Sequence, residues 1–168
     1  MSRGKMMITN YLSPLEFQVT IQKLENVEFF IQKVSIPSIS MAPVIVPTPF
    51  NNTYATPDKL TYSEMSLSFI IDEGMRNYLE VFNWMISISA PQDFKQYRGL
   101  PEDKRDIYSD MSIIMLNSNK NPSIRFNFKN CFPISLSEVS LDTTQQDLQY
   151  PEATVSFQYD YFDIDILR

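Results

Sequence analysis

The chain has 168 residues, the size of one domain with its own core, and it contains no histidine, one cysteine and three glycines. Without histidine most general-base, triad and zinc-ligand arrangements cannot be built, and three scattered glycines exclude a P-loop or a dinucleotide fingerprint. The formal charge of −6 comes entirely from residues 131–168, because residues 1–130 hold as many basic as acidic side chains. A protein that grips nucleic acid through its phosphates is therefore not expected.

The chain is expected to form a single domain over residues 1–168, with residues 1–13 as an N-terminal extension. Residues 1–14 carry Arg3 and Lys5 but only scattered apolar side chains. This pattern fits neither a secretory signal nor a membrane span, so we expect synthesis in the cytosol and no membrane insertion.

Three early segments alternate between apolar and polar residues, which is typical of half-buried strands. Residues 15–21 place Leu15, Phe17, Val19 and Ile21 on one face. Residues 27–34 are predicted to be the hairpin partner of this strand, and residues 60–71 form a long strand with one polar face.

Residues 34–57 lie between these strands, contain no charged side chain and include five prolines. Such a long connection is uncommon in a compact domain and is too apolar to be disordered. It predicts an arm that contacts a partner, although a loop folded back on its own core would have the same composition. The predicted interface residues are Ile36, Ile39, Met41, Val44, Ile45, Val46, Phe50 and Tyr54.

One helix is predicted after Asp72, which we expect to be its N-cap, with Glu73 in the first turn. Its predicted polar stripe is narrow and consists of Arg76, Asn77, Glu80, Asn83 and Ser87. A helix so apolar needs burial on more than one side, either against its own sheet or also against a neighbouring subunit. The residues expected to make these contacts are Phe82, Trp84, Met85 and Ile88.

Pro91 is expected to end the helix, and the charge-rich residues 92–110 to form a solvated loop. A second hairpin is predicted from residues 108–116 and 124–128, followed by strands over residues 134–141 and 153–162. The predicted fold class is mainly β, an antiparallel β-barrel or sandwich with one flanking α-helix.

No catalytic constellation is evident, so we do not expect an enzyme, a cofactor or a metal site. Cys131 has no imidazole to activate it and is interpreted as a small buried hydrophobe. The acid pairs Glu102 with Asp103 and Asp160 with Asp163 are interpreted as solvated surface. The many aromatic residues are interpreted as core, because the basic residues that a single-strand binder needs do not accompany them.

Several segments follow one another in an order that resembles the tail tube proteins of T4-like contractile-tailed bacteriophages, from about residue 14 to residue 163. The resemblance rests on the order and spacing of these segments. They are LEFQVTI at 15–21, EFFIQKV at 28–34, SIP at 35–37, MSLSFIIDE at 65–73, FNW at 82–84, FP at 132–133, EVSLD at 138–142 and ATVSFQYDYF at 153–162.

The resemblance implies a structural virion protein whose hexameric rings stack into the inner tail tube, with partners in the sheath and baseplate. Each subunit would add strands to a continuous inner barrel, the arm at residues 34–57 would pack on the adjoining ring, and phage DNA would pass without specific binding. The tube would be assembled in the host cytoplasm and located in the phage tail. An acidic channel would repel phosphate at short range, and the candidate lumen acids are Glu16, Glu28, Glu64 and Asp160.

Two other hypotheses stay open. Within the same class, the chain could be a tube-like baseplate or initiator subunit, or the tube of a related contractile injection system such as type VI secretion. From a different class, it could be a monomeric ligand-binding β-barrel, because a cavity lined by Phe and Met has the same sequence pattern as a packed core.

Overall fold

The computed structural model describes residues 15–28, 30–89, 107–141 and 150–167. Within them the chain is mainly β: a seven-stranded antiparallel sheet in the order β1-β8-β9-β10-β7-β2, with β11 paired to β9. The strands of this sheet are β1 (Phe17–Ile21), β2 (Ile31–Val34), β7 (Met65–Ile70), β8 (Ser109–Leu116), β9 (Pro122–Leu136), β10 (Glu152–Gln158) and β11 (Tyr161–Ile166).

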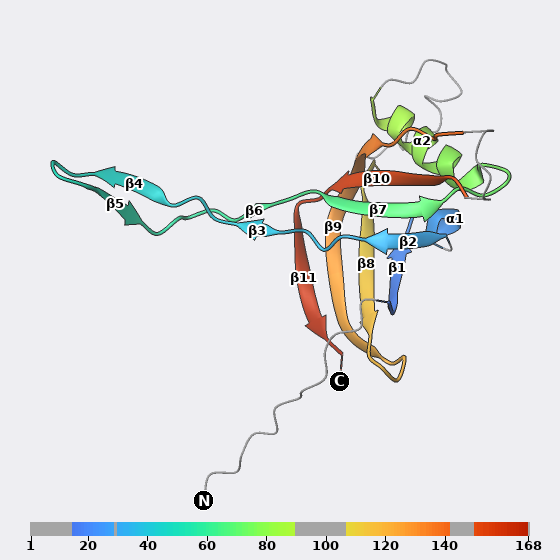
Figure 1. Ribbon diagram of the computed structural model, residues 1–168, viewed down its shortest axis with the longest axis horizontal. Coiled ribbons are helices and arrows are strands. Elements are labelled where there is room, and N and C mark those ends of the chain that lie inside the picture. Colours follow the sequence, from blue (N-terminus) through green and yellow to red (C-terminus); the bar gives the residue numbers. More distant parts are fainter. Residues whose placement is uncertain (1–14, 29, 90–106, 142–149, 168) are drawn as a thin grey trace, which may run out of the picture.

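The long strand β9 belongs to two layers that cross at a steep angle (Figure 1). Its residues 122–131 pair with β8 and β11, and with β1 these strands form what we call the back sheet. Its residues 132–136 pair with β10, and with β7 and β2 these form the arm sheet, so named because the arm leaves it. The two layers resemble an orthogonal sandwich in which one strand turns the corner, and the described pairings close no barrel.

Asn130 is the corner residue of β9, with a φ of 55°, a left-handed conformation that Asn tolerates better than most residues. Its side-chain amide donates to Asp160 Oδ2 at 2.6 Å, and the backbone N–H of Asp160 donates to the carbonyl of Lys129. The neighbouring Lys129 pairs with Asp110 of the adjacent strand β8, with Nζ 2.5 Å from Oδ2. These polar contacts fix the point at which both β9 and the β10–β11 connection pass between the layers.

The arm consists of two short ladders that continue outward from β2 and β7 (Figure 1). Its strands are β3 (Ile39–Ser40), β4 (Val44–Pro47), β5 (Asn52–Ala55) and β6 (Thr61–Tyr62), with β3 paired to β6 and β4 to β5. The two helices are α1 (Glu25–Glu28), a single turn after β1, and α2 (Arg76–Ser89), which packs against α1 and β9.

The core lies between the arm sheet and the back sheet and is filled by large side chains. Phe69 and Phe157 of the arm sheet and Phe128 of the back sheet are completely buried. Trp84 of α2 lies beside Phe157, with ring centroids 6.0 Å apart, so the helix packs onto this core at one end. The described interior is a packed core of aromatic and aliphatic side chains.

The prediction that residues 27–34 form the hairpin partner of β1 is wrong. Leu24 and Val27 are both buried three residues apart, which is a helical spacing, and they anchor α1. The strand β2 starts only at Ile31 and pairs with β7, whereas β1 pairs with β8. Similarly, the long strand predicted over residues 60–71 is divided into β6 and β7.

Two of the predicted C-terminal strands are also divided differently. The segment predicted as a strand from residue 134 is the end of β9, which runs on through the corner to Leu136. The strand predicted over residues 153–162 is two strands, β10 and β11, which break at Asp160 and belong to different layers. A period of two continues across such a corner, so the alternation alone does not reveal it.

The start of the main helix also differs from the prediction. Asp72 is bonded through Oδ1 to the N–H of Gly74 and through its carbonyl to the N–H of Met75, so it caps a turn before the helix. Glu73 lies in this turn, and α2 begins at Arg76 without an acidic residue in its first turn. The predicted end at Pro91, most of the predicted 92–110 loop and the predicted extension at residues 1–13 lie outside the described residues.

Candidate assembly surfaces

The arm projects away from both sheets as a two-stranded ribbon (Figure 1). It keeps its shape through its own backbone pairing, Ile45 opposite Tyr54 and Val46 opposite Thr53. At its tip the N–H of Thr48 donates to the carbonyl of Asn51 at 3.0 Å, and the N–H of Asn51 donates to Thr48 Oγ1 at 3.2 Å. A two-stranded ribbon without a third strand is only marginally stable in water, so it gains from any surface that covers it.

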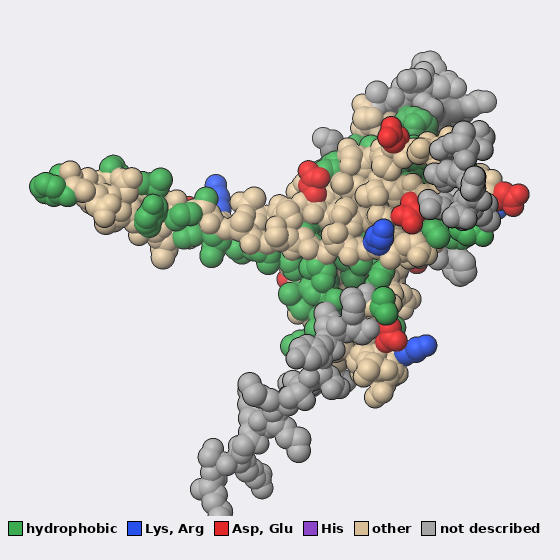
Figure 2. Space-filling view, viewed as in Figure 1, with side chains coloured by type: hydrophobic (Ala, Val, Ile, Leu, Met, Phe, Trp, Pro, Cys, Tyr) green, Lys and Arg blue, Asp and Glu red, His purple; other side chains and the backbone are tan. Residues whose placement is uncertain are grey.

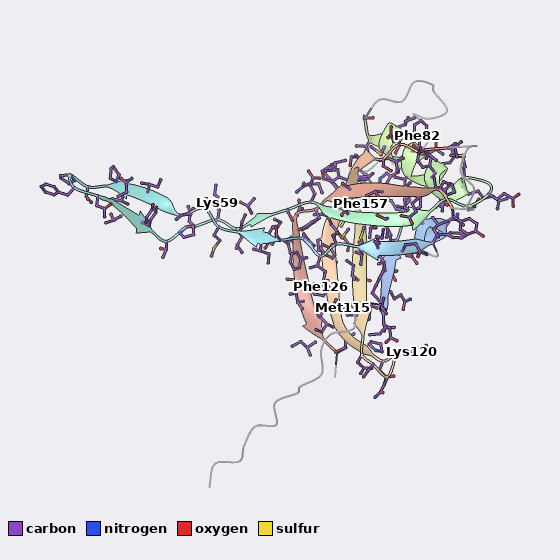
Figure 3. The ribbon with its side chains drawn as sticks, viewed as in Figure 1. Lys59, Phe82, Met115, Lys120, Phe126 and Phe157 are labelled. Atoms are coloured by element: carbon purple, nitrogen blue, oxygen red, sulfur yellow. The ribbon has the colours of Figure 1, made fainter. Side chains whose placement is uncertain are left out.

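Both faces of the ribbon are apolar. Val44 and Val46 point to one side, and Ile45 and its cross-strand neighbour Tyr54 point to the other. Figure 2 shows hydrophobic side chains along the length of the arm, and its basic side chain, Lys59, lies between the two ladders (labelled in Figure 3). All eight predicted interface residues are exposed: Ile36, Ile39, Met41, Val44, Ile45, Val46, Phe50 and Tyr54, with Phe50 at the tip 101% exposed.

The interpretation of this segment as a loop folded back on its own core is therefore wrong. The described chain leaves the arm in contact with solvent on two sides, and an exposed apolar surface of this kind marks an interaction site. The assembly role predicted for its residues stays a prediction at this point.

The four predicted contact residues of α2 do not share one surface. Trp84 is buried, and its Nε1 donates to the carbonyl of Ile107 at 3.0 Å, which confirms the interpretation that it is core. Met85 and Ile88 are partly buried against the same core, whereas Phe82 is 43% exposed. Phe82 lies on α2, away from the arm (Figure 3). Leu79, one turn earlier in the helix, is 47% exposed, so the two form an exposed apolar pair.

Asn77, which the sequence pattern placed on the polar stripe of α2, is completely buried. Its Nδ2 donates to the carbonyl of Ile70 at 2.7 Å, and its Oδ1 accepts from the N–H of Asp72 and of Tyr78. Because the amide satisfies backbone groups at the end of β7, it joins the helix to the arm sheet. No sequence signal distinguishes this role, since Asn has the same polarity whether exposed or bonded inside.

The four candidate lumen acids lie in different places. Glu16 precedes β1 in the back sheet, and Glu28 in α1 accepts a hydrogen bond from the N–H of Ile21. Glu64 and Asp160 are exposed and lie at the same end of the arm sheet, where Met65 is paired with Phe157 and Tyr159 donates to the carbonyl of Ser63. Of the four acids, only Glu64 and Asp160 are placed by the fold at the same end of one sheet.

The outer face of the arm sheet carries a cluster of hydroxyl groups that sequence reasoning missed. Ser68 and Thr154 lie opposite each other with their oxygens 2.9 Å apart, and Ser66 lies opposite Ser156, which in turn lies opposite Ser135. Figure 2 shows this face over β7 and β10 as a broad surface with few charged side chains. In the sequence this cluster is visible only as hydroxyl residues two positions apart in each of two strands, β7 and β10.

Two opposite charges on this face form a pair. Lys33 of β2 and Glu152 of β10 face each other across β7, with Nζ 3.8 Å from Oε2. Both side chains are exposed, so this contact contributes little to stability but leaves no net positive charge on the face. This pair therefore offers a polyanion no phosphate-binding patch.

The arm sheet has two strands with an unpaired edge among the described residues. The strand β2 pairs with β7 alone, and residues 132–136 of β9 pair with β10 alone. Unpaired edges present a row of backbone donors and acceptors, which invites strand pairing with another chain.

No catalytic or metal site is found in the described part of the chain. It contains no group of three Asp, Glu or Cys residues that could hold a metal ion, and no helix in it is long and apolar enough to cross a membrane. Cys131 is completely buried, and burial raises the pKa of its thiol to about 12, so it is inert at neutral pH as the sequence predicted.

Comparison with known proteins agrees with this geometry. The family model for phage tail tube proteins matches residues 6–165, whereas no curated protein matches the chain. A chain of the sheath–tube complex of an extracellular contractile injection system (PVC) in its extended state is 18% identical, with 95% of each chain covered and a TM-score of 0.68. A chain of the sixfold-symmetrised baseplate of the anti-feeding prophage is 14% identical, with 94% of this chain and 97% of that chain covered and a TM-score of 0.67.

A third chain, from the tube-terminating cap of the anti-feeding prophage, is 17% identical over 97% of this chain and 96% of that chain, with a TM-score of 0.69. Similarities at these identities show the fold, and they agree with the tail-tube-like architecture. The match over nearly the whole length shows that this protein belongs to the phage tail tube protein family, whose members are structural and not enzymes.

Proposed function

We propose that this protein forms hexameric rings that stack into the inner tube of a contractile phage tail, through which DNA is delivered. The observation that carries this proposal is the combination of a projecting apolar arm with two unpaired edges on the sheet from which the arm leaves. The edges suit contacts within a ring, and the arm suits contacts between rings. Both types of contact are heterologous, because each joins two different surfaces. The edge contacts would close into a ring, whereas the arm contacts would repeat from ring to ring without closing.

Within a ring, β2 of one subunit would pair with residues 132–136 of β9 in the next. Each subunit would then contribute four strands to a closed barrel, which removes the exposed edges. The number six is supported by the sixfold symmetry of the prophage baseplate that contains a similar chain. About 24 strands spaced about 4.8 Å apart and tilted by about 35–45° give a backbone diameter of about 45–50 Å, which is wide enough for a DNA duplex.

The outer face of the arm sheet would line the channel. Its hydroxyl groups and the balanced pair of Lys33 with Glu152 would let a polyanion pass without holding it. Glu64 and Asp160 would add negative charge at the end of the sheet near the arm. The opposite sheet would then face the sheath, and the exposed pair Leu79 and Phe82 would be available to a neighbouring subunit or to the sheath.

Two neighbouring functions are distinguished by experiment. A baseplate or initiator subunit would form single rings, whereas a tube subunit forms stacks, so negative-stain electron microscopy over a range of concentrations separates them. Particles purified from the host separate a phage from an injection device, because a phage tube is attached to a DNA-filled capsid. Persistent monomers at every concentration, also after addition of isolated baseplates, would contradict the proposal.

A ligand-binding barrel is not favoured, because the described core is filled.

A further inference from the structure

The two ladders of the arm do not form one continuous ribbon. The inner ladder of β3 with β6 ends at the pair Ser40 and Thr61. The outer ladder of β4 with β5 begins at the pair Val44 and Ala55. Between the ladders the first strand has three residues and the second has five. The second strand therefore has two residues more than an antiparallel ladder can pair, and such an excess disrupts the ladder and bends the strand.

We call these intervening residues, 41–43 and 56–60, the joint. They belong to neither ladder. Each side of the joint contains a proline, Pro43 on the first strand and Pro57 on the second, and proline has no N–H to donate. The backbone of the joint is therefore poorly suited to close the gap by pairing across it.

The charge of the arm is confined to the joint. Asp58 and Lys59 are the only charged residues between positions 34 and 63, and both are exposed. Figure 3 shows Lys59 between the two ladders. Because burying either charge would be costly, these residues favour a joint that stays in water.

The inner ladder is fixed to the domain on its near side. The N–H of Ser63 donates to the carbonyl of Ser38 at 3.0 Å, and the carbonyl of Ser63 accepts from Tyr159 Oη at 2.9 Å. The ring of Tyr62 packs against Tyr159 and Phe162, with centroids 6.0 Å and 5.5 Å apart. The inner ladder is thus held to the corner where β10 passes into β11.

The outer ladder has no such anchor among the described residues. The strands β4 and β5 pair only with each other in the described chain, and all of their residues are exposed. Four consecutive cross-strand pairs hold them together. The outer ladder is therefore a separate small ribbon, connected to the domain through the joint alone (Figure 1).

We propose that the joint is a hinge, about which the ribbon of β4 and β5 turns as one body relative to the two sheets. Hinges are typically a few residues at the ends of regular elements, where changes in backbone angles are absorbed. An apolar ribbon on a hinge can meet a partner at a range of angles, and the contact then selects one of them. This use of the hinge rests on the proposed stacking of rings, whereas the hinge itself is a property of the single chain.

The test measures distances between two spin labels by double electron–electron resonance in the dilute full-length monomer. One label is placed in the back sheet at Thr20→Cys. The second is placed on the outer ladder at Thr53→Cys or, as the matched control, on the inner ladder at Thr61→Cys. All three threonines are exposed, whereas the native Cys131 is completely buried and is not expected to react with the label.

Two variants of the joint are compared with the native chain. The continuous variant lacks Asp58 and Lys59 and carries Pro57→Thr, so that each strand has three residues between the ladders and can pair throughout. The length control carries Pro57→Thr with Asp58→Ser and Lys59→Ser. It loses the same proline and the same charges but keeps the two extra residues.

We expect the distances to Thr53→Cys in the native chain to be spread at least twice as widely as those to Thr61→Cys. The continuous variant should narrow this spread at least twofold, and the length control should leave it unchanged. Equal spreads for the two labels in the native chain, or a spread that stays as wide in the continuous variant, would overturn the hinge. A label pair within the ribbon, Val46→Cys with Thr53→Cys, should show the same dipolar broadening in all three chains; its loss would overturn the rigid ribbon.

Negative-stain microscopy tests the use of the hinge in assembly separately. We expect the continuous variant to form rings but at least tenfold fewer stacked tubes than the length control. Equal stacking by both would overturn this use and leave the hinge standing. If the native chain formed neither rings nor tubes, the proposed function would be overturned, and the label distances alone would decide the hinge.

Discussion

Replacing Val44, Ile45 and Val46 together with aspartate should abolish ring stacking and leave the domain folded. These residues are 49%, 57% and 43% exposed, so about half of each side chain is still available for burial in an interface. Complete burial of such a side chain is worth about 1.5–3 kcal/mol, which leaves about 2–4 kcal/mol for the three together. At 1.4 kcal/mol per factor of ten, each arm contact would weaken about 30- to 1,000-fold before any cost of burying the carboxylates.

The domain should be unaffected because β4 and β5 pair only with each other in the described chain. We expect the thermal unfolding midpoint measured by circular dichroism to stay close to that of the wild type. The triple variant Val44→Thr, Ile45→Thr and Val46→Thr is the matched control, since threonine keeps the β-branch and adds no charge. It should stack more weakly than the wild type and more strongly than the aspartate variant.

Sedimentation velocity and negative-stain microscopy measure the stacking in parallel. Tubes of wild-type length from the aspartate variant would show that the arm makes no apolar contact between rings, because such a contact could not accept three carboxylates. Unfolding of the variant would show instead that the arm is part of the domain core, in disagreement with its exposure.

Three further predictions concern stability and the channel. Asn77→Ala should lower the free energy of unfolding by about 1–3 kcal/mol, because the carbonyl of Ile70 loses its buried donor; an unchanged denaturant midpoint would contradict this. Stability should fall above pH 9, because folding raises the pKa of both Cys131 and Tyr159 to about 12, so that the unfolded chain loses these protons first. In a plot of melting temperature against pH, Cys131→Ala and Tyr159→Phe should therefore reduce the decrease on the alkaline side. An unchanged decrease in both variants would contradict this assignment. Ser68→Lys should leave tubes intact but make them retain DNA at low salt, unlike Ser68→Thr, and equal retention by both would remove this face from the channel.

Much of the fold follows from sequence patterns that depend only on local spacing. The alternation in residues 15–21, the hairpin of β8 with β9 and the existence of α2 were all predicted correctly, because each has a strong period and clear turn residues at its ends. The exposed arm was also predicted, since a connection this long is rare inside a compact domain and this one is too apolar to be disordered.

The features that were not predicted depend on contacts between distant segments. No local sequence pattern indicates that β2 pairs with β7 and not with β1. Nor does any indicate that β9 and the β10–β11 segment each cross from one layer to the other. The corner depends on Asn130 meeting Asp160, thirty residues away. The hydroxyl face likewise exists only once β7, β10 and the end of β9 are placed in register, so its residues were visible in the sequence but their proximity was not.

A helical cryo-electron microscopy reconstruction of the assembled tube tests the proposed stacking of rings most directly. We expect β2 of each subunit to pair with residues 132–136 of β9 in the next, the hydroxyl face of the arm sheet to line the channel, and every arm to cross to the adjoining ring. A tube in which the arms point outward toward the sheath, or in which the back sheet lines the channel, would contradict the proposed assembly.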